Sequence, residues 1–223
     1  MTAGHAIVLA DGEPPTRRGL DAAWPGWDDG VDLVVAADGG ARLAASLGLS
    51  LDAWVGDGDS TPESDLLAMR EMGVDVRRSP VAKDESDTEL ALLAAVERGA
   101  GRVTILGALG WRIDHALANL VLLAHPRAAD VAVALLHDGS RVRLLRGGGR
   151  MELPGTVGDI VSLIPLGDAA GVTIEGLRYP LADEPLPAGP ARGLSNIRER
   201  NDAAVRLRAG RLLVVEVPAT LRR

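Results

Sequence analysis

Three short acidic clusters in the first half of the chain contain the residue types best suited to metal and phosphate chemistry. They are Asp57-Gly58-Asp59-Ser60, Lys83-Asp84-Glu85-Ser86-Asp87 and Arg112-Ile113-Asp114-His115. Mg²⁺ prefers oxygen ligands, and it commonly shares its coordination between one or two carboxylates and the phosphates of a substrate. Together the clusters predict one site that binds Mg²⁺ and phosphate, with Asp57 and Asp59 placed to share the metal ion.

Each cluster also has a simpler interpretation as the cap of a helix. Asp59 or Ser60 could cap the helix that follows them. Ser86 opens a capping box ahead of the next helix, and Asp114 suits the positive end of a third. For His115 alone, capping and solvation are favoured over catalysis. A single Asp-x-Asp pair is therefore a weak signal, and the prediction depends on the clusters lying together.

Two basic side chains accompany the acids. Lys83 is the only lysine among 24 lysine and arginine residues. Its ammonium group is a compact charge suited to a phosphate, whereas the planar guanidinium of Arg112 can hold phosphate oxygens with two hydrogen bonds. Both are predicted to neutralise phosphate charge.

The elements that must position these residues alternate between short apolar runs and helical patterns up to about residue 137, which is typical of βαβ units and a parallel sheet. Strands are expected at 6–9, 33–37, 53–55, 74–77, 103–106 and 131–136. Helices are expected at 40–47, 63–72, 87–98 and 114–124. The strand segments are apolar on both faces, as in a buried parallel sheet.

The polar loops follow the carboxyl ends of three of these strands, where open parallel sheets bind ligands. Asp38-Gly39-Gly40 follows the second strand, and the Gly39-Gly40 pair is either a plain turn or a close approach of backbone to a ligand. The segment from Gly107 to Asp114 follows the fifth strand, and Asn119 shares the helix face of Asp114. Asp57-Gly58-Asp59-Ser60 follows the third strand, and all three loops should face one crevice.

From about Gly139 the pattern changes to short alternating runs separated by Gly, Pro and Asp, which favours antiparallel strands in a sandwich or small barrel. Strands are expected at 142–145, 151–153, 160–164, 172–175, 204–208 and 212–217. Residues 182–196 are rich in Pro and Gly and are predicted to form a long loop. We therefore expect an α/β domain at 1–137 and a β domain at 138–223.

Composition narrows the class of protein. The chain has 223 residues, of which 47% are hydrophobic and 25% charged, as in an ordinary globular protein. Its net charge of −7 argues against a protein that binds nucleic-acid backbone. It has no cysteine, and neither a signal peptide nor a membrane span is predicted, so a cytoplasmic location is expected.

Known short motifs for metal and phosphate are missing. Thr61 and Pro62 stand where an EF-hand needs an oxygen ligand and a glycine. Lys83 lacks the glycines of a Walker A loop, and no Gly-x-Gly-x-x-Gly is present.

Taken together, however, the motifs resemble the thiamine pyrophosphokinase family in order and spacing over nearly the whole chain. The motifs are Ala37-Asp38-Gly39-Gly40, Gly56-Asp57-Gly58-Asp59-Ser60, Lys83-Asp84-Glu85-Ser86-Asp87-Thr88-Glu89, Gly107-Ala108-Leu109-Gly110-Trp111-Arg112-Ile113-Asp114-His115 with Asn119, and Gly193-Leu194-Ser195-Asn196. Each motif is weak alone, whereas five in sequence on this layout of elements are a strong signal.

The resemblance implies an α/β nucleotide-binding domain followed by a β-sandwich, in a homodimer with active sites between subunits. It implies transfer of the pyrophosphoryl group of ATP to the hydroxyl of thiamine, giving thiamine diphosphate and AMP. The implied site residues for Mg²⁺ and ATP are Asp38, Asp57, Asp59, Asp87, Arg112 and Asp114, with Asp57, Asp59 and Asp87 as the metal ligands. Ser195 and Asn196 are implied to hold thiamine. Asp87 or Asp114 is the candidate general base.

Three positions depart from the family's usual residues, namely Gly58, Trp111 and Ile197. A stacking aromatic is expected for the cationic thiamine, and the candidates are Trp111, Trp24 and Trp27, each also interpretable as core or interface. Two other functions stay open at this point. One is a different Mg²⁺-dependent nucleotide hydrolase or kinase, and the other is a non-catalytic binder of thiamine or nucleotide.

Overall fold

The structure is a computed structural model that describes residues 4–110 and 112–221. Its contacts divide the chain into two compact units, of which unit 1 ends at Asp138 and unit 2 begins at Gly139.

Unit 1 contains a parallel sheet with the strand order β6-β5-β1-β2-β3-β4. The strands are β1 (Gly4–Leu9), β2 (Val31–Ala37), β3 (Ala53–Gly56), β4 (Asp75–Arg78), β5 (Ala100–Leu106) and β6 (Ala132–His137). The predicted α/β class with a parallel sheet is confirmed. Because the chain runs outward from β1 in one direction and then returns to β5 on the other side, the sheet has its switch point between β1 and β5, where ligands bind in such folds.

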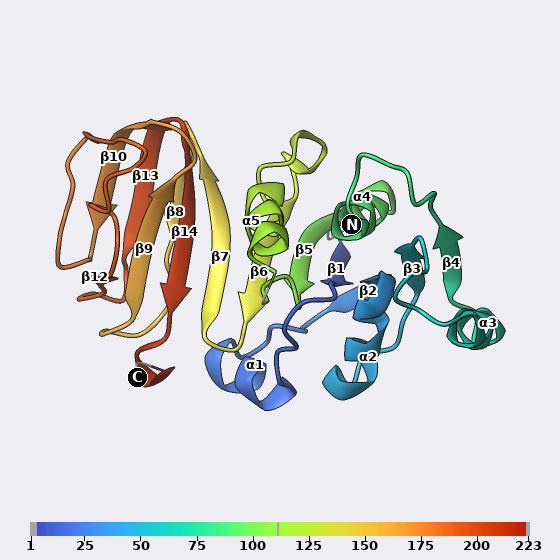
Figure 1. The fold of residues 1–223 in the computed structure, drawn as a ribbon. Coiled ribbons are helices and arrows are strands. Elements are labelled where there is room, and N and C mark those ends of the chain that lie inside the picture. The colour runs from blue at the N-terminus through green and yellow to red at the C-terminus, as the bar shows by residue number, and fades with distance from the viewer. Residues whose placement is uncertain (1–3, 111, 222–223) are drawn as a thin grey trace. The chain divides into compact units, whose positions relative to one another are not determined.

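Helices cover both faces of this sheet (Figure 1). They are α1 (Arg17–Ala23), α2 (Ala41–Leu47), α3 (Glu63–Glu71), α4 (Asp87–Glu97) and α5 (Ile113–Leu122), with single turns η1 (Asp38–Gly40) and η2 (Pro126–Ala128). Helices α1, α2 and α3 lie on one face, and α4 and α5 lie on the other. Ile7 and Leu9 of β1 pack with Leu20 of α1 and Leu47 of α2 in one buried cluster. Helix α1 was not predicted.

Strand β4 departs from the expectation of burial on both faces. Its residues Asp75, Arg77 and Arg78 are exposed, because β4 is the edge strand of the sheet and borders only β3. Charged side chains on an edge strand also discourage pairing with other chains.

Unit 2 is a sandwich of antiparallel strands, as predicted. One group of strands has the order β12-β9-β14-β7 and the other β11-β10-β13-β8. Their bounds are β7 (Ser140–Arg146), β8 (Arg150–Glu152), β9 (Ile160–Pro165), β10 (Ala169–Glu175), β11 (Glu184–Leu186), β12 (Asn196–Ile197), β13 (Ala204–Ala209) and β14 (Arg211–Val217), followed by the turn η3 (Ala219–Leu221). Val161 and Val214 from one group share a buried core with Val172 and Val205 from the other.

The predicted loop at 182–196 is partly wrong, because it contains the short strand β11. Pro185 lies in the middle of this strand. Proline cannot donate to a ladder, and β11 tolerates it because it is at the edge of its sheet.

Over the described ranges, 4–110 and 112–221, no helix is long and apolar enough to cross a membrane.

Candidate active site

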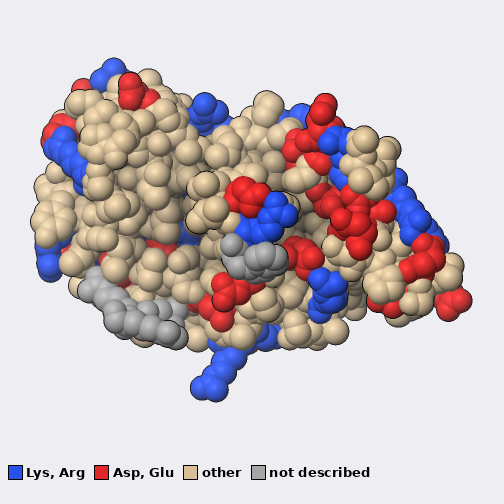
Figure 2. Space-filling view, in the orientation of Figure 1, with Lys and Arg blue, Asp and Glu red and all other residues tan. Residues whose placement is uncertain are grey.

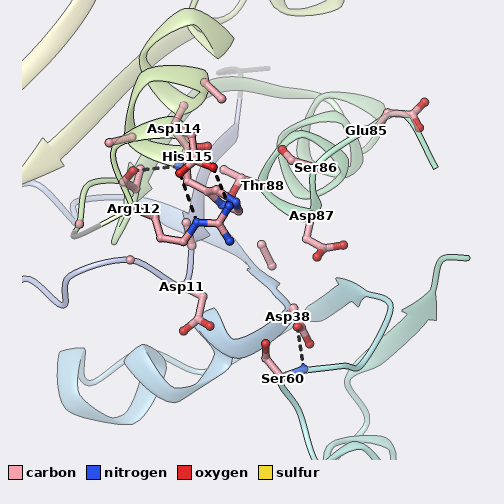
Figure 3. Close-up of a pocket in the computed structure, with 18 of the residues that line it drawn as sticks. Asp11, Asp38, Ser60, Glu85, Ser86, Asp87, Thr88, Arg112, Asp114 and His115 are labelled. Atoms are coloured by element: carbon pink, nitrogen blue, oxygen red, sulfur yellow. Dashed lines mark hydrogen bonds and ion pairs between the residues drawn. The ribbon is translucent and has the colours of Figure 1, made fainter. Parts of the chain in front are cut away.

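A cavity of about 620 Å³ lies in unit 1 at the carboxyl ends of the parallel strands. Its wall includes Asp11 after β1, Asp38 after β2, Asp59 after β3 and Ala108 after β5. The first turns of α4 and α5 complete it (Figure 3). Three of these loops are the ones predicted to face a common crevice. The strand ends thus bring the acidic clusters together, as the parallel sheet requires.

Acidic side chains gather on this part of the surface. Figure 2 shows a dense group of carboxylate-bearing residues in the region where α4 and the end of β3 lie in Figure 1. A negative surface of this kind attracts cations and needs metal ions or basic side chains to accept phosphate.

Three carboxylates come close enough to share one metal ion. Ligand oxygens of Asp38, Asp57 and Asp59 all lie within 4.8 Å of one another. This set of hard oxygen donors fits Mg²⁺, which takes carboxylates together with substrate phosphates. The set includes Asp38 in the place where the sequence predicted Asp87.

Asp38 is the buried member of the three carboxylates, with 5% of its surface exposed. Its side chain accepts hydrogen bonds from the hydroxyl of Thr61 at 2.9 Å and from the backbone N–H of Ser60 at 3.2 Å. Its backbone has a φ of 41°, a left-handed conformation that is uncommon outside glycine and that concentrates at functional sites. Burial raises the pKa of Asp38, and the hydrogen bond from Thr61 opposes that shift.

The loop of residues 57–60, called the acid loop below, does not cap the next helix. The N-cap of α3 is Pro62, and no side chain caps it. Instead, Asp57 Oδ1 accepts the backbone N–H of Asp59 at 3.0 Å, and the hydroxyl of Ser60 donates to Asp59 Oδ1 at 2.9 Å. The capping interpretation of Asp59 and Ser60 is therefore wrong, because their side chains are hydrogen-bonded to each other within the acid loop and not to the start of α3.

Lys83 joins two of the acidic clusters. Its ammonium nitrogen lies 3.2 Å from Asp57 Oδ2 and 3.1 Å from Asp87 Oδ1, and 11% of its side chain is exposed. Burial lowers the pKa of Lys83, but the hydrogen bonds to Asp87 and Asp57 outweigh it and leave the pKa raised. Lys83 thus stays charged and compensates two carboxylates at the edge of the cavity.

The two partners of Lys83 respond in opposite directions. The backbone N–H of Asp59 is the main cause that lowers the pKa of Asp57, with Lys83 adding to it. Burial raises the pKa of Asp87, although Lys83 opposes the shift. Asp87 is therefore the carboxylate of this pair that accepts a proton more readily.

Asp87 is the first residue of α4, and the helix is capped as predicted. The hydroxyl of Ser86 accepts the backbone N–H of Glu89 at 3.2 Å. The reciprocal half of a capping box is replaced, because the carboxylate of Glu89 lies 3.3 Å from Nε2 of His125. Capping and a place in the cavity wall coexist at Ser86.

Arg112 and Asp114 form a bidentate pair at the start of α5, with separations of 3.2 and 2.6 Å. Both side chains are more than half exposed and line the cavity. The hydrogen bond from Arg112 lowers the pKa of Asp114 to about 2. Asn119 donates to the carbonyl of Ala108 at 2.8 Å, so its amide fixes the loop after β5 rather than Asp114.

The predicted glycines lie behind the wall. A Cβ at Gly40 would stand 2.1 Å from the carbonyl of Leu9, so the strand-to-helix turn requires glycine there. Gly107 has a φ of 67° and is hydrogen-bonded through its carbonyl to the N–H of Gly12 at 2.6 Å. Gly39, Gly40 and Gly107 shape the backbone next to the lining residues, and none of them lines the cavity.

Sequence reasoning missed Asp11, which belongs to none of the predicted clusters. Asp11 lines the cavity, and its Oδ1 accepts from Arg42 Nη2 at 2.7 Å. The strand-end rule applied to β1 would have found it, because Asp11 follows that strand as Asp38 follows β2.

In unit 2 the predicted Ser195-Asn196 motif forms a tightly held turn. Ser195 is exposed and has a φ of 56°. Asn196 is 6% exposed, and its amide accepts from the N–H groups of Tyr179 and Ile197, both at 2.9 Å, and donates to the carbonyl of Tyr179 at 2.7 Å. The amide of Asn196 is committed to the backbone.

The aromatic candidates separate by exposure. Trp27 is 5% exposed with Arg17 over its ring, and Trp24 donates to the carbonyl of His137, so both belong to the packing of unit 1. Trp111 lies outside the described residues. Among the residues that the structure does describe, Tyr179 is the exposed aromatic, with 61% of its surface accessible.

Comparison with known families gives two matches along the chain. Residues 27–135 match the model described as "Thiamin pyrophosphokinase, catalytic domain", and residues 150–212 match "Thiamin pyrophosphokinase, vitamin B1 binding domain". Together the two matches take in well over half of the chain.

Individual proteins that are similar to this chain have the same family name. A protein named thiamine pyrophosphokinase from Bacillus subtilis is 25% identical over 172 residues, which are 77% of this chain and 80% of that protein. A solved thiamin pyrophosphokinase family protein from Enterococcus faecalis is 28% identical with a TM-score of 0.81, over 96% of this chain and 99% of the other. The yeast thiamin pyrophosphokinase structure, at 15% identity, shares the fold, with a TM-score of 0.79 over 99% of this chain and 88% of its own.

Proposed function

The chain belongs to the thiamin pyrophosphokinase family of ATP-dependent diphosphotransferases, and from this premise we propose that the cavity of unit 1 binds ATP and is where its pyrophosphoryl group passes to thiamine. The observation that carries the proposal is the convergence of Asp38, Asp57 and Asp59, with Lys83 and Arg112 nearby, at the carboxyl ends of the strands.

Asp38, Asp57 and Asp59 would hold Mg²⁺, since their oxygens form a compact donor set. When bound, Mg²⁺ supplies positive charge that neutralises phosphate oxygens during transfer. A cation would bind favourably here, because it would relieve the repulsion among three carboxylates whose oxygens lie within 4.8 Å of one another.

Lys83 and Arg112 provide the remaining positive charge for the phosphates. Phosphoryl transfer is catalysed mainly by positioning and charge neutralisation, so these roles are the ones that the chemistry requires. Arg112 is held by Asp114 at an exposed position on the wall, and its planar group suits phosphate oxygens.

In the transfer step the hydroxyl oxygen of thiamine forms a bond to the β-phosphorus of ATP. The bond between that phosphorus and the oxygen bridging to the α-phosphate breaks, and its electron pair leaves with AMP. The hydroxyl proton passes to a carboxylate. We assign this role to Asp87 rather than Asp114, because a carboxyl with a pKa of about 2 is a poor proton acceptor, whereas burial raises the pKa of Asp87.

Unit 2 is proposed to bind thiamine, supported by its match to a vitamin B1 binding domain. Ser195 presents its side chain to solvent from a strained backbone position. Tyr179 offers an exposed ring for the cationic heterocycle, and the Asn196 amide fixes the backbone of Tyr179 on both sides. Asn196 is thus a positioning residue for this platform.

The homodimer with active sites between subunits, implied by the family resemblance, is proposed with the same assignment. A cytoplasmic location likewise stays a prediction.

Labelled ATP tests the proposed reaction. With ³²P at the β-position, radioactivity should appear in thiamine diphosphate, and with ³²P at the α-position it should remain in AMP. Label from the γ-position alone in a thiamine product would indicate a simple kinase. Release of labelled pyrophosphate without any thiamine product would indicate a hydrolase, and binding of both ligands without turnover would indicate a non-catalytic relative.

A further inference from the structure

Arg42 joins two walls of the cavity without belonging to any of the predicted clusters. It is the second residue of α2. Its Nη2 donates to Asp11 Oδ1 at 2.7 Å, and its Nη1 donates to the carbonyl of Ser60 at 3.1 Å. Asp11 follows β1 and Ser60 follows β3, so one guanidinium spans the end of the intervening strand β2. Figure 3 shows Asp11 and Ser60, the two residues that Arg42 connects.

The contact with Ser60 reaches two metal-binding carboxylates. The backbone N–H of Ser60 donates to Asp38 Oδ2 at 3.2 Å, and its hydroxyl donates to Asp59 Oδ1 at 2.9 Å. Arg42 therefore holds, through one residue, the acid loop and the buried carboxylate in the relative position that the metal donor set needs. A planar guanidinium can make both contacts at once, and a lysine ammonium at this position would have to choose one.

Gly39 leaves the room that this arrangement needs. A Cβ at Gly39 would stand 2.3 Å from Asp11 Oδ2 and 2.6 Å from Arg42 Nη2. The φ of Gly39 is not positive, so space rather than backbone conformation requires glycine here. Since the obstructing atoms are the ends of two side chains, a methyl group would displace the Arg42–Asp11 pair rather than the backbone.

Stability does not account for the arrangement. Arg42 and Asp11 have side chains that are 62% and 41% exposed, and ion pairs so open to solvent contribute little to folding. The two contacts of Arg42 connect two loops of the cavity wall, and their effect is to fix the positions of those loops.

We propose that Arg42 is a positioning residue for the metal and ATP site, bracing the acid loop against Asp11 through Ser60. The proposal rests on the proposed function for its ligand and deepens it. Partners of metal ligands typically change metal affinity about 10- to 100-fold when they are removed. Because Arg42 acts through Ser60, its loss should weaken metal binding about tenfold, at the lower end of that range.

The test measures Mn²⁺ binding to the full chain without nucleotide, by electron paramagnetic resonance of free Mn²⁺. Arg42→Ala should raise the Mn²⁺ dissociation constant about tenfold. The constant of Arg42→Lys should lie between those of the unchanged protein and Arg42→Ala, because lysine keeps one of the two contacts. Arg18→Ala, an exposed arginine on α1, is the matched control and should bind as the unchanged protein does. The urea unfolding midpoints of all variants should equal that of the unchanged protein.

Gly39→Ala supplies an independent way to disrupt the contact between Arg42 and Asp11 while Arg42 is present. It should weaken Mn²⁺ binding as Arg42→Ala does, and the double variant should be no weaker than either single one, because both remove the same contact. Additive losses would overturn the proposal, as would wild-type Mn²⁺ affinity in Arg42→Ala.

Turnover separates this proposal from the proposed function. Saturating Mg²⁺ should restore the kcat of Arg42→Ala, since a positioning defect in metal binding is overcome by mass action. A kcat that stays low at saturating Mg²⁺ would contradict it. If Arg42→Ala loses Mn²⁺ affinity but the unchanged protein makes no thiamine diphosphate, the brace stands and the proposed function fails. If thiamine diphosphate forms and Mn²⁺ binding is unchanged, the reverse holds.

Discussion

The acid loop of unit 1 and the Ser195-Asn196 turn of unit 2 use their polar side chains in opposite ways. In the acid loop, Asp59 faces the cavity and its oxygens lie with those of two other carboxylates. In the turn, the Asn196 amide is buried and makes three hydrogen bonds to backbone. The difference shows that a polar residue in a motif does not always bind the ligand, because its side chain can instead hold the backbone in place through hydrogen bonds.

The largest effect that this contrast predicts is at Asp59. Asp59→Asn should lower kcat/KM about 100- to 1,000-fold, because charge stabilisation at the reacting phosphate depends on the metal that Asp59 is proposed to hold. The free energy of unfolding should change by less than about 0.5 kcal/mol, as for other exposed positions. Steady-state kinetics and urea unfolding measure the two, with Asp65→Asn on α3 as the exposed control. Loss of folding would mean that Asp59 serves the fold rather than the metal.

Asn196 should show the reverse pattern. Asn196→Ala leaves the backbone groups of Tyr179 and Ile197 without their partner and should cost about 1–3 kcal/mol of unfolding free energy. Urea denaturation measures the change, and Asn201→Ala, an exposed asparagine in a nearby turn, is the control. Unchanged stability together with a lost affinity for thiamine would mean that the Asn196 amide binds the substrate instead.

Tyr179 tests whether the held turn presents a platform. Tyr179→Ala should raise the KM for thiamine about tenfold, in line with the energies of aromatic contacts. Tyr179→Phe should keep the wild-type KM, since the ring rather than the hydroxyl makes the contact. Kinetics at saturating ATP measure both. Equal KM values for all three proteins would place the stacking group elsewhere.

The smallest effect is expected in the pH dependence of stability. Because burial raises the folded-state pKa of Asp87 above its ordinary value of 3.8, its ionisation disfavours the folded state as pH rises above that value. Asp87→Asn should therefore be more stable than the unchanged protein at neutral pH, and the difference should vanish as pH falls to that value.

Asp57 provides the matched contrast, with the opposite sign. Its folded-state pKa is lowered, so its ionisation adds stability that is present above 3.8 and lost as pH falls through the lowered pKa. Asp57→Asn should be the less stable variant at neutral pH. Urea midpoints between pH 3 and 8 would show the two differences diverge. If both variants shift the same way, the electrostatic description of the Lys83 pair is wrong.

Much of this arrangement is predictable from sequence, since hydrophobic periodicity places the parallel strands and four of the helices of unit 1. The strand-end rule then places the acidic clusters in one cavity. Helix α1 escapes prediction because its seven residues bury only Leu20, which leaves almost no apolar periodicity. Strand β11 escapes because Pro185 signals a breaker unless the edge position is known.

The residues that sequence reasoning misassigns or misses depend on contacts between distant segments. The amide of Asn196 is hydrogen-bonded to Tyr179, which lies 17 positions earlier, and Arg42 is paired with Asp11, which lies 31 positions away. No local pattern encodes either contact. The identity of the third carboxylate of the proposed metal site, Asp38 beside Asp57 and Asp59, likewise follows from the register of β2 and β3.

Product analysis tests the central claim most directly. The protein would be incubated with thiamine, ATP and Mg²⁺, and ³¹P NMR would follow every phosphorus. The account predicts that thiamine diphosphate and AMP appear in equal amounts and that AMP does not form when thiamine is left out. Formation of ADP, or of pyrophosphate without thiamine diphosphate, would contradict it.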